Sequence, residues 1–220
     1  MKQIIISCRM IEQELAKILD EEHIDIPVLY VPAGLHLEPE KLREYLQNLI
    51  DSIENVDRIL MTISNCGNAT VGLTATNAEL VLPNCSDCID LMLTREKFAD
   101  LVRSRDSMFM TESWLEKSET FPGGYLEAEE RYGTEAANEM LRMMYENYNY
   151  YELIDTGTYD VEVVKEYLSP RAEVAGMTFR IVDGPCEPLR KLVRGQIDDD
   201  FIIVPKGESV KMDMFRIMCG

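Results

Sequence analysis

The chain has 220 residues, of which 46% are hydrophobic and 28% are charged, and its formal net charge is −18. This length and composition suffice for a folded core and exclude an intrinsically disordered chain. Binding to nucleic acid or to anionic membranes depends on clustered Lys and Arg, and 22 basic residues against 40 acidic ones argue against both partners. The acidic surface either keeps the protein soluble or attracts a cationic ligand or a basic partner face.

The apolar runs, such as Ile4–Ile6 and Ile59–Ile63, have the length of strands and are too short to span a membrane. The N-terminal segment is typical of a first buried strand and lacks the long apolar region of a signal peptide. We therefore predict a cytoplasmic protein, in which thiols stay reduced. The six cysteines are accordingly interpreted as ligands, nucleophiles or buried residues before disulfides.

Strand-like and helix-like segments alternate along the chain. This pattern predicts an α/β fold with a mostly parallel sheet and helices on both faces, made of Rossmann-like or flavodoxin-like units. The predicted strands are Ile4–Ser7, Pro27–Val31, Arg58–Ile63, Glu79–Leu82, Met108–Met110, Tyr150–Ile154, Thr178–Val182 and Phe201–Val204. The predicted helices are 11–19, 39–54, about fifteen residues capped by Asp87, then 127–148, 161–168 and 187–193. We predict one domain over residues 1–220, with a possible seam near 122–124, and later strands that return to the same sheet.

Unusual residues follow several of the predicted strands. They are Cys8, His36, the triplet Cys66-Gly67-Asn68, the segment Cys85–Cys88, and Cys186. Because the carboxyl ends of parallel strands share one edge of the sheet, residues far apart in sequence are expected to meet there. The alternative is that each cysteine is a small buried core residue, which is the simpler explanation for Cys8 taken alone. Cys219 is interpreted as a tail residue without a role.

Cys85-Ser86-Asp87-Cys88 has the CxxC spacing, which lets two thiolates hold one metal or form a redox pair. Its position at the start of a predicted helix favours the thiolate form. The motif lacks the second CxxC pair of a zinc ribbon and the sequence context of thioredoxin. Metal binding and nucleophilic chemistry therefore both remain open for this segment.

Cys66-Gly67-Asn68 predicts a turn in which glycine permits a positive φ or the close approach of a ligand. His36 is a candidate ligand or general acid/base, or it is a residue that makes local hydrogen bonds. Trp114, the single tryptophan, either forms the floor of a binding pocket or closes the core. The four tyrosines within 145–151 are candidates for an aromatic cage, for core packing or for an oligomer interface.

Several stretches together are similar to domain-of-unknown-function family 1638, in residues and in order. They are Pro32–His36, Cys66–Asn68 with Val71–Leu73, Leu82-Pro83 with Asp87–Ile89, Thr111–Glu116 and Leu189–Pro205. Members of this uncharacterised family are common in methanogens and anaerobic bacteria and often accompany corrinoid-dependent methylamine methyltransferases. The resemblance thus implies an accessory role in anaerobic one-carbon metabolism. Relatives usually carry a histidine where this chain has Ser86, so Cys85 is a candidate replacement for it.

Three hypotheses follow. In the first, Cys8, Cys66, Cys85 and Cys88 bind zinc or an iron–sulfur cluster, in a metal carrier or an enzyme. The second is a metal-free small-molecule enzyme with Cys66 or Cys88 as nucleophile and His36 as base, with Gly67, Asn68 and Trp114 contacting the ligand. The third is a non-enzymatic partner of a corrinoid methyltransferase, so that corrinoid would be reached only through that partner. A homo-oligomer is compatible with all three.

Overall fold

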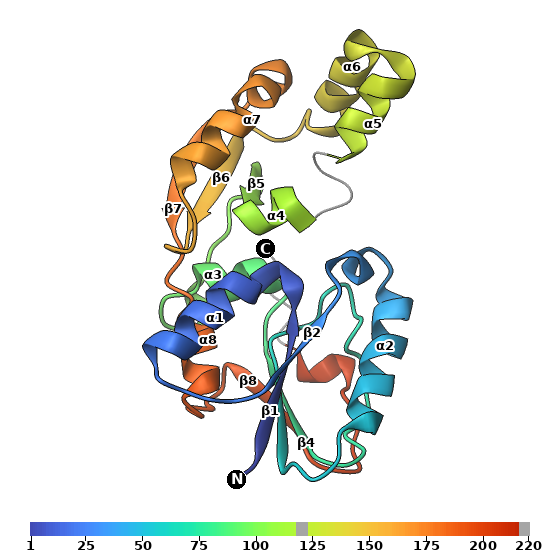
Figure 1. The fold of residues 1–220 in the computed structure, drawn as a ribbon, viewed down its shortest axis with the longest axis vertical. Helices are drawn as coiled ribbons and strands as arrows, with labels where there is room; N and C mark the ends of the chain where they lie inside the picture. Colours follow the sequence, from blue (N-terminus) through green and yellow to red (C-terminus); the bar gives the residue numbers. More distant parts are fainter. Residues whose placement is uncertain (118–122, 216–220) are drawn as a thin grey trace. The chain divides into compact units, whose positions relative to one another are not determined.

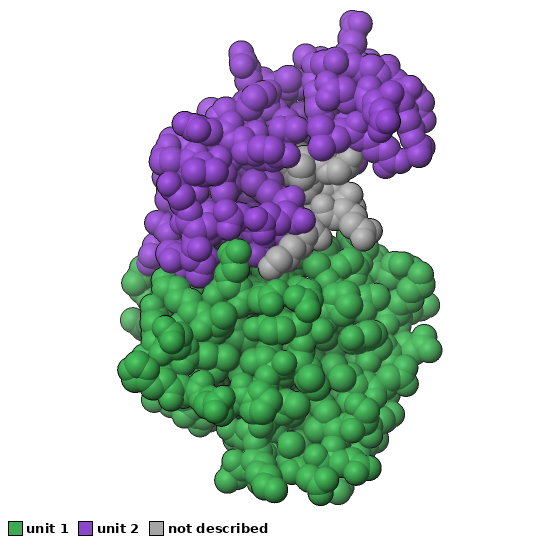
Figure 2. Space-filling model, viewed as in Figure 1, with its two compact units in different colours: residues 1–101, 185–220 green, residues 102–184 purple. Residues whose placement is uncertain are grey.

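The computed structural model describes residues 1–117 and 123–215. Its chain divides into two compact units, unit 1 with residues 1–101 and 185–220 and unit 2 with residues 102–184 (Figure 2). The predicted seam near 122–124 lies within the range of unit 2, and only its residue 122 falls outside the described residues. The prediction of one domain over residues 1–220 stays a prediction.

Unit 1 contains a five-stranded sheet in the order β2-β1-β3-β4-β8. Its strands are β1 (Gln3–Cys8), β2 (Val28–Val31), β3 (Arg58–Met61), β4 (Glu79–Pro83) and β8 (Phe201–Val204). The first four are parallel, and β8 runs antiparallel to β4. The α/β class with mostly parallel strands is therefore confirmed.

Helices cover both faces of this sheet (Figure 1). They are α1 (Glu12–Glu21), α2 (Pro39–Ser52), α3 (Cys88–Leu93) and α8 (Glu187–Val193). The apolar stripe Leu42, Leu46 and Ile50 of α2 packs with alternate strand residues such as Ile6 and Met61. The intervening residues, Ile5 among them, are equally buried and point to the other face, as the period of two in a strand requires. Burial on both faces explains why these strands are continuous apolar runs in the sequence.

Unit 2 contains a second sheet in the order β5-β6-β7, with all strands parallel. Its elements are β5 (Ser107–Met110), α4 (Glu112–Lys117), α5 (Gly123–Tyr132), α6 (Thr134–Met144), β6 (Tyr150–Asp155), α7 (Val161–Ala175) and β7 (Thr178–Asp183). Of the later strands only β8 joins the first sheet, so the prediction that the later strands share it is wrong for β6 and β7. Both sheets have the same local βα pattern, so the sequence pattern does not show which strands pair. Strand pairing is decided by contacts between residues far apart in sequence.

Three predicted helices also differ from the structure. The helix predicted over 161–168 continues to Ala175. The helix capped by Asp87 ends at Leu93 and is followed by a 3₁₀ turn at Phe98–Asp100, because Lys191 and Asp200 bind the backbone of this connection. The long helix predicted over 127–148 is two helices that meet at Gly133, whose φ of 85° suits glycine and no helical residue. Among the described residues, no helix has both the length and the apolar character needed to cross a membrane.

Candidate functional site

The parallel strands of unit 1 end at one edge of the sheet, and cysteines follow them there. β1 ends at Cys8, and the chain that leaves β3 continues alongside β1, because the Thr62 N–H donates to the Ile6 carbonyl at 3.0 Å. β4 ends at Pro83, two residues before Cys85. We call Cys8 together with residues 64–68 and 85–88 the thiol edge.

Backbone hydrogen bonds join the two loops of the thiol edge. The Asn65 N–H donates to the Cys85 carbonyl at 3.3 Å, and the Cys66 N–H donates to the Ser86 carbonyl at 2.9 Å. Cys66 is therefore fixed beside the CxxC segment, although 19 to 22 positions separate it from the two motif cysteines in sequence. The strand order brings these two loops together, while a cluster of all the predicted cysteines stays a prediction.

The turn at Cys66-Gly67-Asn68 has three consecutive positive φ angles, of 44°, 67° and 68°. A non-glycine residue in this region costs about 1–3 kcal/mol, so surrounding contacts must hold Cys66 there. One such contact is the Arg43 guanidinium, which donates to the Asn68 carbonyl at 2.9 Å. Gly67 lies close to α2, since a Cβ built on it would be 3.4 Å from the Pro39 side chain.

Two carboxylates organise the CxxC segment. Asp87 caps α3 by accepting the N–H groups of Ile89 at 3.0 Å and Asp90 at 3.3 Å. The buried Asp90 carboxylate accepts the Ser86 N–H at 2.9 Å. The loop that carries Cys85 and Cys88 is thus held from both sides by negatively charged groups.

A buried hydroxyl lies between two of the thiols. Ser64 Oγ is 3.6 Å from Cys66 Sγ, and the Ser64 side chain also forms a hydrogen bond with Cys85. Cys85 in turn donates to the Asp87 carbonyl at 3.5 Å. Ser64 therefore links the turn after β3 to the CxxC segment through side chains as well as backbone.

Burial is the largest cause that raises the pKa of each of these thiols. The pKa of Cys66 rises to about 12, with further contributions from the nearby Cys8 and Asp87 charges. The pKa of Cys88 is also raised, by burial and then by Cys66, Asp87 and Cys8. Burial and then Asp90 raise the pKa of Cys85. Cys8 thus contributes to the raised pKa of both Cys66 and Cys88, and Cys66 contributes to that of Cys88.

The principal causes of these shifts share one property. The causes that raise these pKa values are burial, other thiols and the carboxylates Asp87 and Asp90, whereas hydrogen bonds, chiefly from Ser64, lower them. For the described residues no Lys, Arg or His ranks among the largest causes. Ionised thiols at this edge would therefore face other anions in a poorly hydrated site. The edge is suited to neutral thiols or to thiolates that a bound cation neutralises.

The cysteine side chains of the thiol edge are compatible with core packing and are not arranged as the ligands of a metal ion. Cys8 and Cys66 are partly buried and pack against the apolar core of unit 1. Within residues 1–117 and 123–215, no three His, Cys, Asp or Glu side chains are already placed to hold one metal ion. Coordination by Cys8, Cys66 and Cys88 would therefore require rotation of their side chains.

The other predicted histidine and cysteine residues are carried by other segments. His36 is in the 3₁₀ turn Ala33–Leu37 and is not among the principal groups that shift the thiol pKa values. Cys186 is buried at the start of α8, where its N–H donates to the Met92 carbonyl at 3.1 Å, and it too is absent from those groups. Cys219 lies outside the described residues.

The aromatic candidates belong to the core of unit 2. Trp114 packs against this core, and Tyr151 is fully buried in it. Tyr145 packs edge-to-face against Tyr151 at 6.4 Å between ring centroids, and Tyr151 stacks on Phe179 at 5.7 Å. These contacts favour packing over an aromatic cage for the tyrosine cluster.

Sequence reasoning missed Ser64 and Asp90 as members of the edge. A serine two positions before a cysteine has no distinctive signal. Asp90 could have been found, because an acidic residue three positions after a helix N-cap often reaches back to the backbone in front of the helix.

A shallow depression of about 600 Å³ borders the turn after Cys66. One wall is Glu38 and the first turn of α2, and the other wall is formed by Gly67 and Asn68. The charged residues Glu38, Lys41 and Arg43 are among those that line it. Because Glu38 and Lys41 form an ion pair with each other and Arg43 donates to Asn68, most of these charges are already paired.

The profile of the family described as "Protein of unknown function (DUF1638)" matches residues 30–193. The chain belongs to this family. The matched range contains Cys66, Cys85 and Cys88, while Cys8 precedes it. No curated protein and no solved structure matches the chain.

Proposed function

We propose that this DUF1638 protein binds a thiophilic metal, zinc or the iron of an iron–sulfur cluster, through Cys8, Cys66 and Cys88. The observation that carries the proposal is the Cys66 N–H that donates to the Ser86 carbonyl at 2.9 Å and fixes Cys66 beside the CxxC segment, while β1 brings Cys8 to the same edge of the sheet. Thiolate sulfur is a soft ligand that favours zinc and iron–sulfur clusters over magnesium or calcium.

The charges at the thiol edge support a cation as the ligand. Three ionised thiols beside Asp87 would repel one another, and a divalent metal supplies the positive charge that their principal neighbours lack. The same environment opposes a metal-free nucleophile, because a reactive cysteine needs a lowered pKa and Cys66 has a pKa of about 12. The interactions that lower this pKa are hydrogen bonds with Ser64, and burial outweighs them.

The structure suggests a division of roles among the four cysteines. Cys85 is buried near Asp90 and donates to the Asp87 carbonyl. We therefore propose that Cys85 stabilises the loop rather than binds the metal. Three thiolates would hold the metal and leave one tetrahedral position for a substrate or for Cys85. The bound metal would supply Lewis-acid chemistry or activation of a bound thiol at that position.

The test is the metal content of protein purified without oxygen, measured by elemental analysis. In the wild type we expect close to one zinc, or the iron of one cluster, per chain. In Cys66→Ser and Cys88→Ser we expect the affinity for the metal to fall about tenfold or more. Cys186→Ser is the control, because Cys186 is a buried free cysteine outside the proposed set of ligands. Wild-type protein with less than about 0.2 metal per chain after metal-supplemented expression would contradict the proposal.

The corrinoid connection stays a prediction that depends on family resemblance alone. If the protein is an accessory to a corrinoid methyltransferase, a corrinoid protein should co-purify with the tagged wild type under anaerobic conditions. The Cys66→Ser variant tests whether metal binding and association with the partner are coupled. Loss of the partner would indicate that they are coupled, and retention would indicate that they are independent.

A further inference from the structure

Strand β7 is the open edge of the unit 2 sheet. The strand order β5-β6-β7 places both β5 and β7 at edges (Figure 1). Three of the four residues of β5 are buried, whereas none of the six residues of β7 is. The two edges are therefore unequal, and the longer strand is the exposed one.

The direction of the backbone groups of β7 follows from its pairing with β6. The Thr178 N–H donates to the carbonyl of Asn149, just before β6, and the Gly184 N–H donates to the carbonyl of Asp155 in β6, each at 2.9 Å. In a parallel strand, alternate residues direct both N–H and C=O to the same neighbour. The even-numbered residues of β7 therefore face β6, and Phe179 and Ile181 direct their amide and carbonyl groups outward, where no described residue pairs with them.

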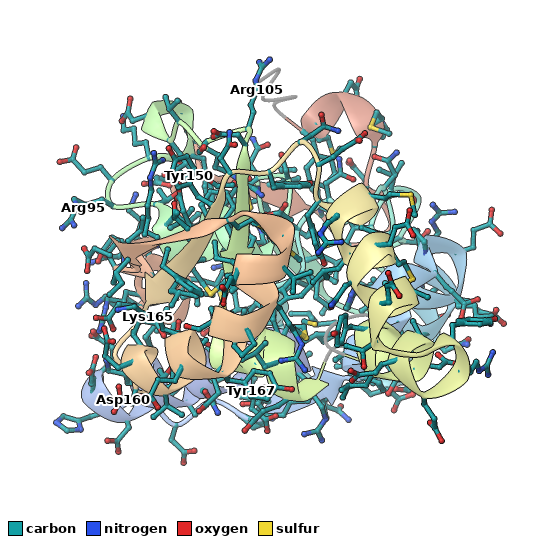
Figure 3. All side chains as sticks on the ribbon, turned by 90° about the horizontal axis from the view of Figure 1, so that it is seen from above. Arg95, Arg105, Tyr150, Asp160, Lys165 and Tyr167 are labelled. Atoms are coloured by element: carbon teal, nitrogen blue, oxygen red, sulfur yellow. The ribbon has the colours of Figure 1, made fainter. Side chains whose placement is uncertain are left out.

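The side chains of β7 do not protect this edge. Its sequence, Thr-Phe-Arg-Ile-Val-Asp, is rich in residues that favour strands and contains no Pro, Gly or Lys. Ile181 is 52% exposed. Arg180 is held over the Tyr150 ring at 3.2 Å and 3.6 Å from Glu152, on the face of the sheet rather than along its edge (Tyr150 is labelled in Figure 3).

We propose that β7 pairs with β7 of a second copy of the chain in an antiparallel, two-fold symmetric arrangement that joins the two sheets. Only odd-numbered residues have outward backbone groups, so odd residues must face odd residues across the axis. An axis at Ile181 gives the longest overlap, in which residues 179–183 of the two strands face each other. Ile181 then exchanges two backbone hydrogen bonds with its symmetry mate, and the two exposed side chains come into contact.

Charge and symmetry favour a second copy over a foreign strand. Arg180 and Asp183 give β7 no net charge, so two copies can approach there although each chain carries −18. A two-fold contact also pairs the β7 edges of both copies with each other, which leaves neither β7 strand open for further pairing. Because the remaining surfaces repel, association should strengthen as salt is raised.

The experiment is sedimentation velocity on reduced protein with EDTA at about 50 μM, so that metal binding and disulfides do not contribute. We expect a species of twice the 25.2 kDa chain mass for the wild type and a monomer for Ile181→Lys. Ile203→Lys is the matched control, since Ile203 is 45% exposed on strand β8, and it should remain a dimer. Ile181→Pro, which removes one outward N–H and leaves the β6 ladder intact, should also weaken the dimer.

Hydrogen exchange provides the second measurement. In the wild-type dimer the amides of Phe179 and Ile181 should exchange at least about tenfold more slowly than in Ile181→Lys, whose far-ultraviolet circular dichroism should match the wild type. A monomeric wild type would overturn the proposal. So would a dimer that survives Ile181→Lys or that dissociates equally with Ile203→Lys. None of these results bears on metal content, so failure here is distinct from failure of the proposed metal site.

Discussion

The carboxyl edges of the two sheets carry different chemistry. At the edge of the first sheet, cysteines follow the strands and bring Ser64 and Asp87 beside them. At the edge of the second sheet, β6 and β7 end side by side at the register partners Asp155 and Asp183. Both sheets are parallel there, so topology supplies the edge and the residues decide what it can bind.

The two edges also differ in how tightly they are closed. At the second edge the Gly184 N–H donates to the Asp155 carbonyl at 2.9 Å, and a Cβ at position 184 would lie 2.6 Å from the Ile154 side chain and 2.8 Å from Thr156. At the first edge Gly67 is exposed, and its nearest contact for a Cβ is at 3.4 Å. Close packing at one edge and exposed backbone at the other indicate that the first is the better place for a ligand.

The largest effect should come from Gly184→Ala. The added methyl group overlaps two side chains of the second edge, and we expect a loss of about 2–3 kcal/mol in the free energy of unfolding, measured with urea. Gly124→Ala in α5 is the control, because no atom of the described residues lies within 4 Å of a Cβ there, and it should be neutral or stabilising. Equal effects of the two substitutions would show that the second edge is not closely packed.

The next prediction concerns how stability depends on pH, which should differ between substitutions at the two edges. In the metal-free protein the pKa of Cys66 is about 12 in the folded state, against 9.0 as its ordinary value. The folded state then keeps a proton that the unfolded chain releases, so this contribution is complete below about pH 8.5 and is lost as pH rises toward 12. Between pH 7.5 and 10, wild type should lose about 1 kcal/mol more stability than Cys66→Ser.

The control for this pH effect lies at the other edge. Thr158 makes a hydroxyl contact with Thr156 at 2.8 Å and is remote from the thiols in sequence. Thr158→Ala should therefore follow the wild-type pH dependence. If Cys66→Ser and Thr158→Ala lose stability in parallel above pH 9, the buried thiol is not the cause.

The smallest effect concerns the two aspartates that cap helices, Asp87 of α3 and Asp160 of α7. Asn caps a helix about as well as Asp, so Asp87→Asn removes the charge and preserves the cap. Because the Asp87 charge raises the pKa of Cys66 and Cys88, alkylation of these thiols at pH 8 should become about two- to threefold faster. Asp160→Asn should leave the rates unchanged, and equal rates in both variants would remove Asp87 from the thiol site.

Local sequence pattern predicted most elements of the fold. β8 and α8 were predicted with their observed bounds, because a short apolar run and a Glu-Pro helix start are strong local signals. The division into two sheets was not predicted, since it depends on which strands pair across distance. The end of α3 at Leu93 was missed for a similar reason: Lys191 and Asp200, about a hundred residues away in sequence, fix the chain that follows.

The candidate site was predicted in part. The rule that parallel strands deliver their ends to one edge brought Cys66 and the CxxC segment together correctly, because it needs only strand order. The rule could not predict that the thiols would be buried among carboxylates, so the lowered thiol pKa expected from the start of α3 is wrong for Cys88. It also could not assign Trp114, which packs in the core of unit 2.

The most direct test of the thiol edge is X-ray absorption at the metal edge of protein purified without oxygen. If Cys8, Cys66 and Cys88 share one metal, the spectrum should show at least three sulfur neighbours at about 2.3 Å, and one fewer in Cys88→Ser. A first shell made only of nitrogen and oxygen, or a sulfur count that Cys88→Ser leaves unchanged, would contradict the account.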